Sequence, residues 1–178
     1  MELTDADLVA RVLIDDDQHA FGELVRRHQS SVRGLLRQLT RTDLALADDL
    51  AQDAFLRAYK HIRSFRGESK FSTWLYRIAY NVFREEARRR KELVGIDEAR
   101  LEAEQDPQTA DPGLRHDLMH ALNLLPLHER SAIVLCCQNG LSHDEAARVL
   151  DIPLGTVKTN VLRGREKLKR TLAAWGPN

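Results

Sequence analysis

The chain has 178 residues and a mass of 20.3 kDa, which suits one ordinary domain or two small ones and excludes a large catalytic barrel. Its 27 basic and 27 acidic side chains give a net charge of zero, and its 43% apolar and 30% charged residues exclude wholesale disorder. Aromatic residues make up only 6%, and β-branched residues are sparse, so we expect an all-α fold.

The sequence shows no sign of secretion or of a membrane-spanning segment. Residues 1–7 carry acidic side chains where a secretory signal needs basic ones, and the longest apolar run, 132–137, is too short to span a bilayer. These features predict a cytoplasmic protein. Cys136 and Cys137 are adjacent in that run, a spacing that suits neither a disulfide framework nor a metal site. We expect both to be reduced core residues.

The neutral total charge conceals a division along the chain. Residues 1–90 hold 16 basic and 14 acidic side chains, residues 91–113 hold 2 and 7, and residues 114–178 hold 9 and 6. The middle segment also contains two prolines, two glycines and no aromatic residue, which predicts an acidic linker between two helical lobes. As a flexible coil it would span roughly 25–30 Å, enough for the lobes to reach separate sites on one large partner.

Three segments of the first lobe have apolar residues at the spacing of an amphipathic helix. They run from Phe21 to Leu39, from Ala47 to Ile62 and from Trp74 to Phe83. Outside its apolar stripe, the second segment begins with the polar residues Asp48, Asp49, Gln52 and Asp53. One explanation of these residues is that acidic side chains at a helix N-terminus stabilise the helix dipole. The other explanation is that they form a contact patch for a basic helix of a partner protein. No second ligand set, Gly-rich phosphate loop or nucleophile accompanies them, so we expect no catalytic or metal site.

The third segment has a polar face that combines basic, amide and aromatic side chains. Its members are Arg77, Tyr80, Asn81, Arg84 and Arg88. This composition is typical of a surface for single-stranded nucleic acid, where cations follow phosphates and flat groups receive unstacked bases. The alternative is a solvated helix face on which Glu85 and Glu86 pair locally with the arginines.

The second lobe contains a helix-turn-helix pattern. Ser142 and Glu145 have the spacing of a capping box, the helix that they open is broken at 151–153, and a second helix begins near Thr156. Apolar and small residues such as Val157 face inward on that helix. The second helix of this motif enters the major groove. The residues in reach of bases or phosphates are Thr156, Lys158, Thr159, Asn160 and Arg163, and Arg165, Lys167, Lys169 and Arg170 would hold the DNA backbone.

The chain closely resembles bacterial RNA polymerase sigma factors of the extracytoplasmic-function (ECF) group. Four segments carry the resemblance in order: DDLAQDAFLRAYKHIRSFRG, FSTWLYRIAYNVFREEARRR, LPLHERSAIVLCC and GLSHDEAARVLDIPLGTVKTNVLRGREKLKR. It implies that the first lobe (1–90) is sigma region 2, the second (114–178) is sigma region 4, and 91–113 is the family's acidic linker. Asp151 departs from the pattern, because the turn of the motif usually has Gly there.

The resemblance also implies roles for particular residues. Asp49, Gln52, Asp53 and Phe55 would dock on the clamp helices of the largest polymerase subunit. Lys70, Phe71, Ser72 and Asn81 would capture a flipped base of the minus-ten promoter element. Lys158, Thr159, Asn160 and Arg163 fall on the helix that reads the minus-thirty-five element. Trp74 matches a family tryptophan, but it lies at the edge of the apolar stripe, and we expect it in the core.

The expected function is that of a promoter-specificity subunit that binds core RNA polymerase and promoter DNA, supports strand opening, needs no cofactor and is not an enzyme by itself. The resemblance further implies inhibition by an anti-sigma factor, which is often tethered to the membrane. The alternatives are a stand-alone helix-turn-helix regulator, which would need symmetric half-sites, and a small hydrolase or nucleotide-handling enzyme, which only the acidic cluster favours.

Overall fold

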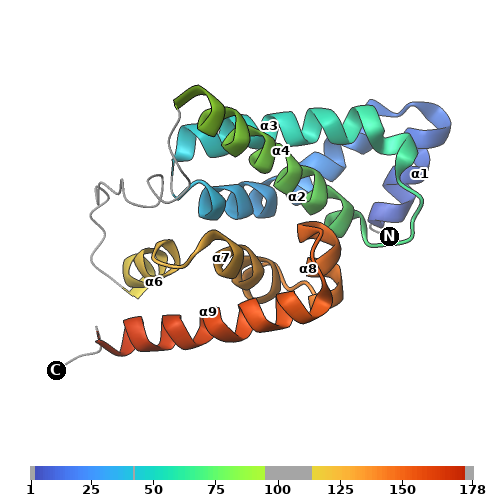
Figure 1. The fold of residues 1–178 in the computed structure, drawn as a ribbon. Helices are drawn as coiled ribbons and strands as arrows, with labels where there is room; N and C mark the ends of the chain where they lie inside the picture. Colours follow the sequence, from blue (N-terminus) through green and yellow to red (C-terminus); the bar gives the residue numbers. More distant parts are fainter. Residues whose placement is uncertain (1–2, 42, 95–113, 175–178) are drawn as a thin grey trace.

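A computed structural model describes residues 3–41, 43–94 and 114–174, and in these residues it contains helices and no strand. The first lobe consists of α1 (Asp5–Asp15), α2 (Gln18–Leu39), α3 (Leu44–His61), the 3-10 turn η1 (Ile62–Ser64) and α4 (Phe71–Val94). The second lobe consists of α6 (Leu114–Asn123), α7 (Leu127–Ile133), the π-helical turn η2 (Val134–Gln138), α8 (His143–Leu150) and α9 (Leu154–Ala174) (Figure 1). The predicted all-α fold is confirmed.

The three helices predicted in the first lobe are α2, α3 and α4, and α1 adds a helix that the periodicity did not reveal. A capping box opens α1, in which Thr4 and Asp7 bond each other's backbone N–H. Asp5 ties α1 to α2, because its carboxylate lies 2.7 Å from His28 Nε2 and 3.3 Å from Arg27 Nη1. Helix α4 continues to Val94, past the predicted lobe boundary at residue 90. The rest of the predicted linker, 95–113, lies outside the described residues.

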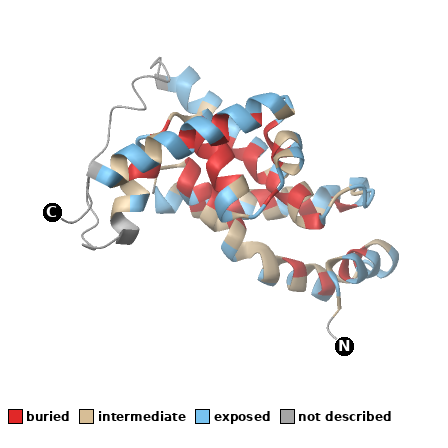
Figure 2. Cartoon of the chain, turned by 90° about the horizontal axis from the view of Figure 1, so that it is seen from below, coloured by how far each residue is buried: buried red, intermediate tan, exposed pale blue. Residues whose placement is uncertain are grey.

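Small residues let the helices of the first lobe approach one another closely. The inward face of α3 consists largely of alanines, of which Ala47, Ala54 and Ala58 are completely buried. Larger side chains on α2 and α4, such as Leu36 and Leu75, fill the space beside them. Figure 2 shows the buried residues of the chain concentrated where the helices meet, with exposed residues on the outer faces.

The second lobe contains the predicted helix-turn-helix, formed by α8 and α9. Glu145 N donates to Ser142 Oγ at 3.1 Å and Ser142 N donates to Glu145 Oε2 at 2.8 Å, so the predicted capping box is present. Asp151 ends α8 with φ +56°, a left-handed conformation that Asp tolerates better than most residues. This explains how Asp can replace Gly in the turn. Helix α9 begins at Leu154, earlier than predicted.

The expectation that both cysteines lie in the core was wrong for Cys137. Cys136 is half-buried, and burial raises the pKa of its thiol to about 11, whereas Cys137 is exposed, 3.3 Å from Arg165 Nη2. The cause is η2, in which Asn139 N donates to Val134 O across five residues. A π turn holds more residues than an α turn. It therefore rotates Cys137 away from the buried side of Val134.

The two lobes pack against each other. Helix α4 contacts α8, and α2 contacts α7 (Figure 1). The buried apolar cluster is continuous between the lobes, and Arg130 of α7 is itself buried, with Nη2 donating to Leu39 O at the end of α2. The predicted polymerase- and DNA-binding residues therefore lie on one packed body, some of them at the seam between its halves.

Candidate functional site

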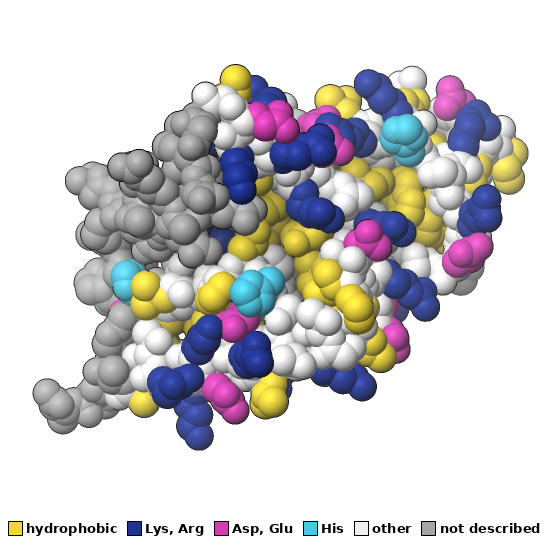
Figure 3. All heavy atoms as spheres, in the orientation of Figure 1, with side chains coloured by type: hydrophobic (Ala, Val, Ile, Leu, Met, Phe, Trp, Pro, Cys, Tyr) yellow, Lys and Arg dark blue, Asp and Glu magenta, His cyan; other side chains and the backbone are white. Residues whose placement is uncertain are grey.

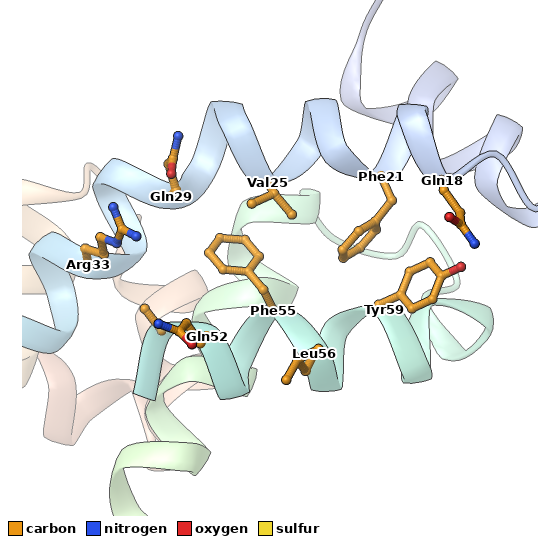
Figure 4. A pocket seen from close by; sticks show the side chains of 10 residues that line it. Gln18, Phe21, Val25, Gln29, Arg33, Gln52, Phe55, Leu56 and Tyr59 are labelled. Atoms are coloured by element: carbon orange, nitrogen blue, oxygen red, sulfur yellow. The ribbon is translucent and has the colours of Figure 1, made fainter. Parts of the chain in front are cut away.

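A groove of about 550 Å³ runs between α2 and α3. Its walls are mainly apolar and aromatic: Phe21 and Val25 on α2 face Phe55 and Tyr59 on α3 (Figure 4). The rings of Phe21 and Tyr59 are 4.9 Å apart between centroids. Leu56 also lines the groove although 59% of its surface is exposed. An apolar, exposed groove between two helices fits the side chains of a partner helix.

The predicted acidic residues of α3 lie beside this groove. Asp49 and Gln52 are exposed, and Gln52 lines the groove. Asp48 Oδ1 lies 3.5 Å from Arg33 Nε of α2, so part of its charge is used within the lobe. Phe55 is half-buried in the groove wall. The structure thus brings the predicted polar residues and Phe55 together on one surface.

Asp53 belongs to a small network of ion pairs that links α3 to α4. Asp53 Oδ2 lies 3.0 Å from Arg57 Nη2, and Arg57 Nη1 lies 2.6 Å from Glu85 Oε2. The hydrogen bonds from Arg57 to Asp53 and, second, to Glu85 raise the pKa of the Arg57 guanidinium. Since these pairs are largely exposed, they orient the side chains more than they stabilise the fold.

A second hollow, of about 280 Å³, lies at the N-terminal end of α4. Phe65 from the preceding loop and Trp74 from α4 line it, with ring centroids 5.4 Å apart, and Arg66 and Arg77 also line it. Arg148 of α8 lines the hollow from the second lobe. The prediction that Trp74 is a core residue is only half right, because its ring is partly buried against Phe65 and partly open to this hollow.

The residues predicted to capture a flipped base differ in their exposure to solvent. Lys70 is exposed and Ser72 is half-buried, but Phe71 is 95% buried behind Phe65 and Trp74. The expectation of an accessible Phe71 ring was therefore wrong. Phe71 is the inner member of an aromatic cluster that supports the other two rings.

Tyr80 is buried as well, although the pattern placed it on the exposed basic face of α4. Only 9% of its surface is exposed, because the second lobe covers it at Ser131, and this burial raises the pKa of the phenol. Its predicted neighbours Asn81, Arg84 and Arg88 are exposed. They line a third hollow, of about 710 Å³, whose opposite wall comes from the second lobe at Leu127, Leu150, Asp151 and Ile152.

The predicted reading helix, α9, presents a polar outer face. Thr156, Lys158, Thr159 and Arg163 are all exposed, and Thr159 Oγ1 donates to Gly155 O within the helix. Figure 3 shows Lys and Arg side chains along α9 and also over the first lobe. Of the residues predicted to hold the DNA backbone, Arg165, Lys169 and Arg170 are exposed, whereas Lys167 Nζ lies 2.8 Å from the buried Glu129 Oε1.

One residue predicted to read bases faces the protein interior, and one exposed residue of α9 was not among those predicted. Asn160 is 95% buried, because it shares the inward face of α9 with Val157 and Val161 at three- and four-residue spacing. Leu162 is 60% exposed between Thr159 and Arg163. The helix-turn-helix pattern does not single out this residue, although the sequence shows a large apolar side chain between polar ones at that position.

Within residues 3–41, 43–94 and 114–174, no group of three His, Cys, Asp or Glu side chains is placed to hold a metal ion. In the same residues, no helix is both long enough and apolar enough to cross a membrane.

Comparison with known proteins gives two family matches in chain order. A family model described as Sigma-70 region 2 matches residues 24–92, and one described as Sigma-70, region 4 matches residues 115–168. The chain is also similar to the ECF RNA polymerase sigma-E factor of Haemophilus influenzae, with 34% identity over 96% of each chain.

Two solved structures share the fold. One is the sigma factor RpoE in complex with the anti-sigma factor NepR from Bartonella quintana, with a TM-score of 0.74 and 26% identity over 86% of this chain and 96% of that one. The other is CnrH in complex with the cytosolic domain of CnrY, with a TM-score of 0.70 and 30% identity over 96% of this chain and 97% of that one.

Proposed function

Because this chain belongs to the ECF group of RNA polymerase sigma factors, we propose that its first lobe binds core polymerase and the melted minus-ten strand while its second lobe reads the minus-thirty-five element. One observation carries this proposal: an apolar groove flanked by acids and an aromatic-basic hollow lie on the lobe that matches region 2, and an exposed polar helix lies on the lobe that matches region 4.

We assign polymerase binding to the groove between α2 and α3. A clamp helix of the largest polymerase subunit would place apolar side chains against Phe55 and Leu56, while Asp49 and Gln52 meet its polar edge. Apolar contacts at the centre of such an interface supply most of the affinity, and charges at its rim supply orientation. The free carboxylate of Asp49 suits a basic partner, since no ion pair engages it among the described residues.

We assign capture of an unstacked base to the hollow formed by Phe65, Trp74 and Arg77. Aromatic rings stack on any base, with about 1–3 kcal/mol per base, which offsets a cost of roughly a few kcal/mol for unstacking it. Arg66 lines the same hollow and Lys70 is exposed just before α4, and both would hold the flanking phosphates. Asn81, Arg84 and Arg88 would then guide the strand along α4.

We assign minus-thirty-five recognition to the outer face of α9. Arg163 suits guanine, because guanidinium groups form paired hydrogen bonds with it in the major groove. Leu162 suits the methyl group of thymine, an apolar contact that Thr159 could share. Thr156 and Lys158, near the start of α9, are placed for phosphates.

We further propose that the chain acts in the cytoplasm, carries out no chemical step of its own and is held inactive by an anti-sigma factor. The similar sigma factor RpoE was solved in complex with the anti-sigma factor NepR, and the similar protein CnrH was solved in complex with the cytosolic domain of CnrY, which supports this regulation.

The test is in-vitro transcription with purified core polymerase on genomic fragments, with and without this protein. New discrete start sites that share two spaced upstream elements are the expected result. Tight binding of the purified protein alone to a symmetric duplex, with no new start site, would favour the stand-alone regulator instead.

A further inference from the structure

A fourth hollow, of about 790 Å³, lies between α2 of the first lobe and α6, η2 and α9 of the second. Part of its wall is apolar and consists of Met119, Leu122, Ile133, Val134 and Leu168. It shares no lining residue with the groove between α2 and α3 or with the two hollows beside α4. Sites for small molecules typically have about 300–1,000 Å³, mainly apolar walls and a few polar groups. This hollow therefore has the size of a small-molecule site, and the proposed function does not use it.

One cysteine of the adjacent pair lines the hollow. Cys137 is exposed and belongs to the wall, whereas Cys136 is half-buried and does not. The π-helical turn η2 causes this difference, because it rotates Cys137 away from the buried side of Val134. A cysteine thiol, once ionised, attacks the sulfur of a disulfide. A molecule in the hollow therefore meets a nucleophile.

Two arginines make the polar part of the wall positively charged. Arg165 Nη2 lies 3.3 Å from Cys137 Sγ, and no carboxylate of the described residues pairs with Arg165. Arg37 Nη2 lies 3.7 Å from Asp48 Oδ1, but the same oxygen also lies 3.5 Å from Arg33 Nε, so the charge of Arg37 is only partly matched. None of the described residues that line the hollow is acidic. This charge favours an anionic molecule.

A buried amide gives an independent sign of a ligand. Gln38 lines the hollow although only 5% of its surface is exposed. Its Nε2 donates to Met119 Sδ at 2.9 Å, but its Oε1 has no hydrogen-bond partner among the described residues. Buried acceptors in folded proteins are nearly always paired. An N–H group of a molecule in the hollow would supply the donor that Gln38 Oε1 lacks.

We propose that this hollow binds a small disulfide that carries carboxylates and peptide N–H groups, and that Cys137 forms a mixed disulfide with it. The carboxylates meet Arg37 and Arg165, and an N–H group donates to Gln38 Oε1. The methylene groups of the same molecule pack on the apolar wall.

The reaction is a thiol–disulfide exchange. The Cys137 thiolate attacks one sulfur of the small disulfide, so that a new bond forms to Cys137 Sγ while the S–S bond of the reagent breaks. The other half leaves as a thiolate and takes up the proton that Cys137 gave to the solvent. Cys137 is oxidised and the leaving half is reduced, so the step needs no further oxidant.

Four disulfides of different charge test this proposal on the full chain. The Cys136→Ala variant is used, because Cys137 is then the only cysteine. The reagents are oxidised glutathione, which is anionic and has peptide N–H groups; 3,3′-dithiodipropionate, which is anionic without them; neutral bis(2-hydroxyethyl) disulfide; and cationic cystamine. Intact-protein mass spectrometry gives the rate of each mixed disulfide. Each rate is divided by the rate of the same reagent with N-acetylcysteinamide, which removes differences in intrinsic reactivity.

We expect the normalised rate of oxidised glutathione to exceed that of cystamine about tenfold and that of dithiodipropionate about threefold. The preference for anions over cations should shrink at high salt, because ions screen the two arginines. Equal normalised rates for all four reagents would overturn the inference. So would a preference for the neutral or the cationic reagent.

Variants of the wall separate recognition from simple exposure of the thiol. Arg37→Gln should lower the rate of oxidised glutathione about threefold and leave that of the neutral reagent unchanged. Arg63→Gln is the matched control, since Arg63 is exposed and does not line the hollow. A uniform change of all four rates in Arg37→Gln, or no change, would contradict the assigned site.

Gln38→Leu tests the buried acceptor. It removes Oε1, so the rate of oxidised glutathione should fall to that of dithiodipropionate, which has no N–H group to donate. An unchanged ratio of these two rates would exclude Gln38 from the site. The reagent series and Arg37→Gln test the proposal even if Gln38→Leu does not fold. None of these measurements uses polymerase or DNA, so their outcome is independent of the proposed function.

Discussion

Gly164 of α9 lies so close to Ile133 of α7 that a Cβ atom on the glycine would stand 2.8 Å from Ile133 Cγ1. The absence of a side chain at this position sets how closely α9, the proposed reading helix, packs on the second lobe. Ile133 is itself 95% buried, so it has little room to move aside.

Gly164→Ala should therefore destabilise the protein although alanine is the better helix former. Overpacking of this kind costs about 1–3 kcal/mol, which exceeds the gain of up to about 1 kcal/mol in helix propensity. Urea unfolding measures the difference. Gly155→Ala is the control, since nothing lies within 4 Å of its Cβ position. Equal stability of the two variants would show that α7 and α9 are not packed this closely.

Leu56→Ser should weaken binding to core polymerase about tenfold, or about 1.4 kcal/mol, because it removes an exposed apolar side chain from the groove between α2 and α3. Leu44→Ser is the matched control on the same helix, since Leu44 is 52% exposed but does not line the groove. Titration of labelled protein with core polymerase measures both. Similar affinities for the two variants would place the polymerase site elsewhere.

Asn81→Ala and Arg84→Ala should each lower the rate of open-complex formation several-fold and change the affinity for polymerase less than twofold. Both residues line the hollow beside α4, in the proposed path of the melted strand. Arg89→Ala serves as the comparison, because Arg89 is paired with Glu86 at 2.8 Å and does not line that hollow. Permanganate reactivity of unpaired thymines reports opening. Equal loss of polymerase binding and opening would count against a melting role.

Asn160→Ala and Arg163→Ala should have different effects although both lie on α9. Because Asn160 is buried, Asn160→Ala should lower the free energy of unfolding by about 1 kcal/mol and leave promoter preference unchanged. Because Arg163 is exposed, Arg163→Ala should leave stability unchanged but weaken the preference at one base pair of the minus-thirty-five element by about 1–3 kcal/mol. Transcription from a library randomised in that element measures preference, and altered preference in Asn160→Ala would show that its side chain turns outward on DNA.

The two adjacent cysteines should react at different rates. Iodoacetamide at pH 8 should modify the exposed Cys137 first, since burial raises the pKa of Cys136 to about 11 and keeps it a thiol. Because burial raises the pKa of the Cys136 thiol above its ordinary value, folding favours the neutral form of this side chain. This contribution is complete below pH 9 and is lost as the pH rises toward 11. Peptide mass spectrometry gives the order of modification, and simultaneous labelling would contradict the rotated η2 turn.

Local signals in the sequence were sufficient to predict the helices and the turn motif. The stripes of α2, α3 and α4 repeat every three or four residues, and the capping box of Ser142 and Glu145 lies within a single turn, so neither depends on distant residues. The same periodicity places Asn160 on the inward face of α9, three residues after Val157, whereas the helix-turn-helix motif alone suggests a base-reading residue there.

The sequence by itself determined the all-α class, the order of the two lobes and most members of the candidate surfaces, because these follow from helical periodicity and short motifs. Only the tertiary structure decided which polar faces are covered. Phe71 and Tyr80 lie on faces of α4 that could meet either solvent or protein, and they are buried by Trp74 nearby and by Ser131 of the other lobe. Burial depends on which distant segments pack together, and periodicity within one helix carries no information about that partner.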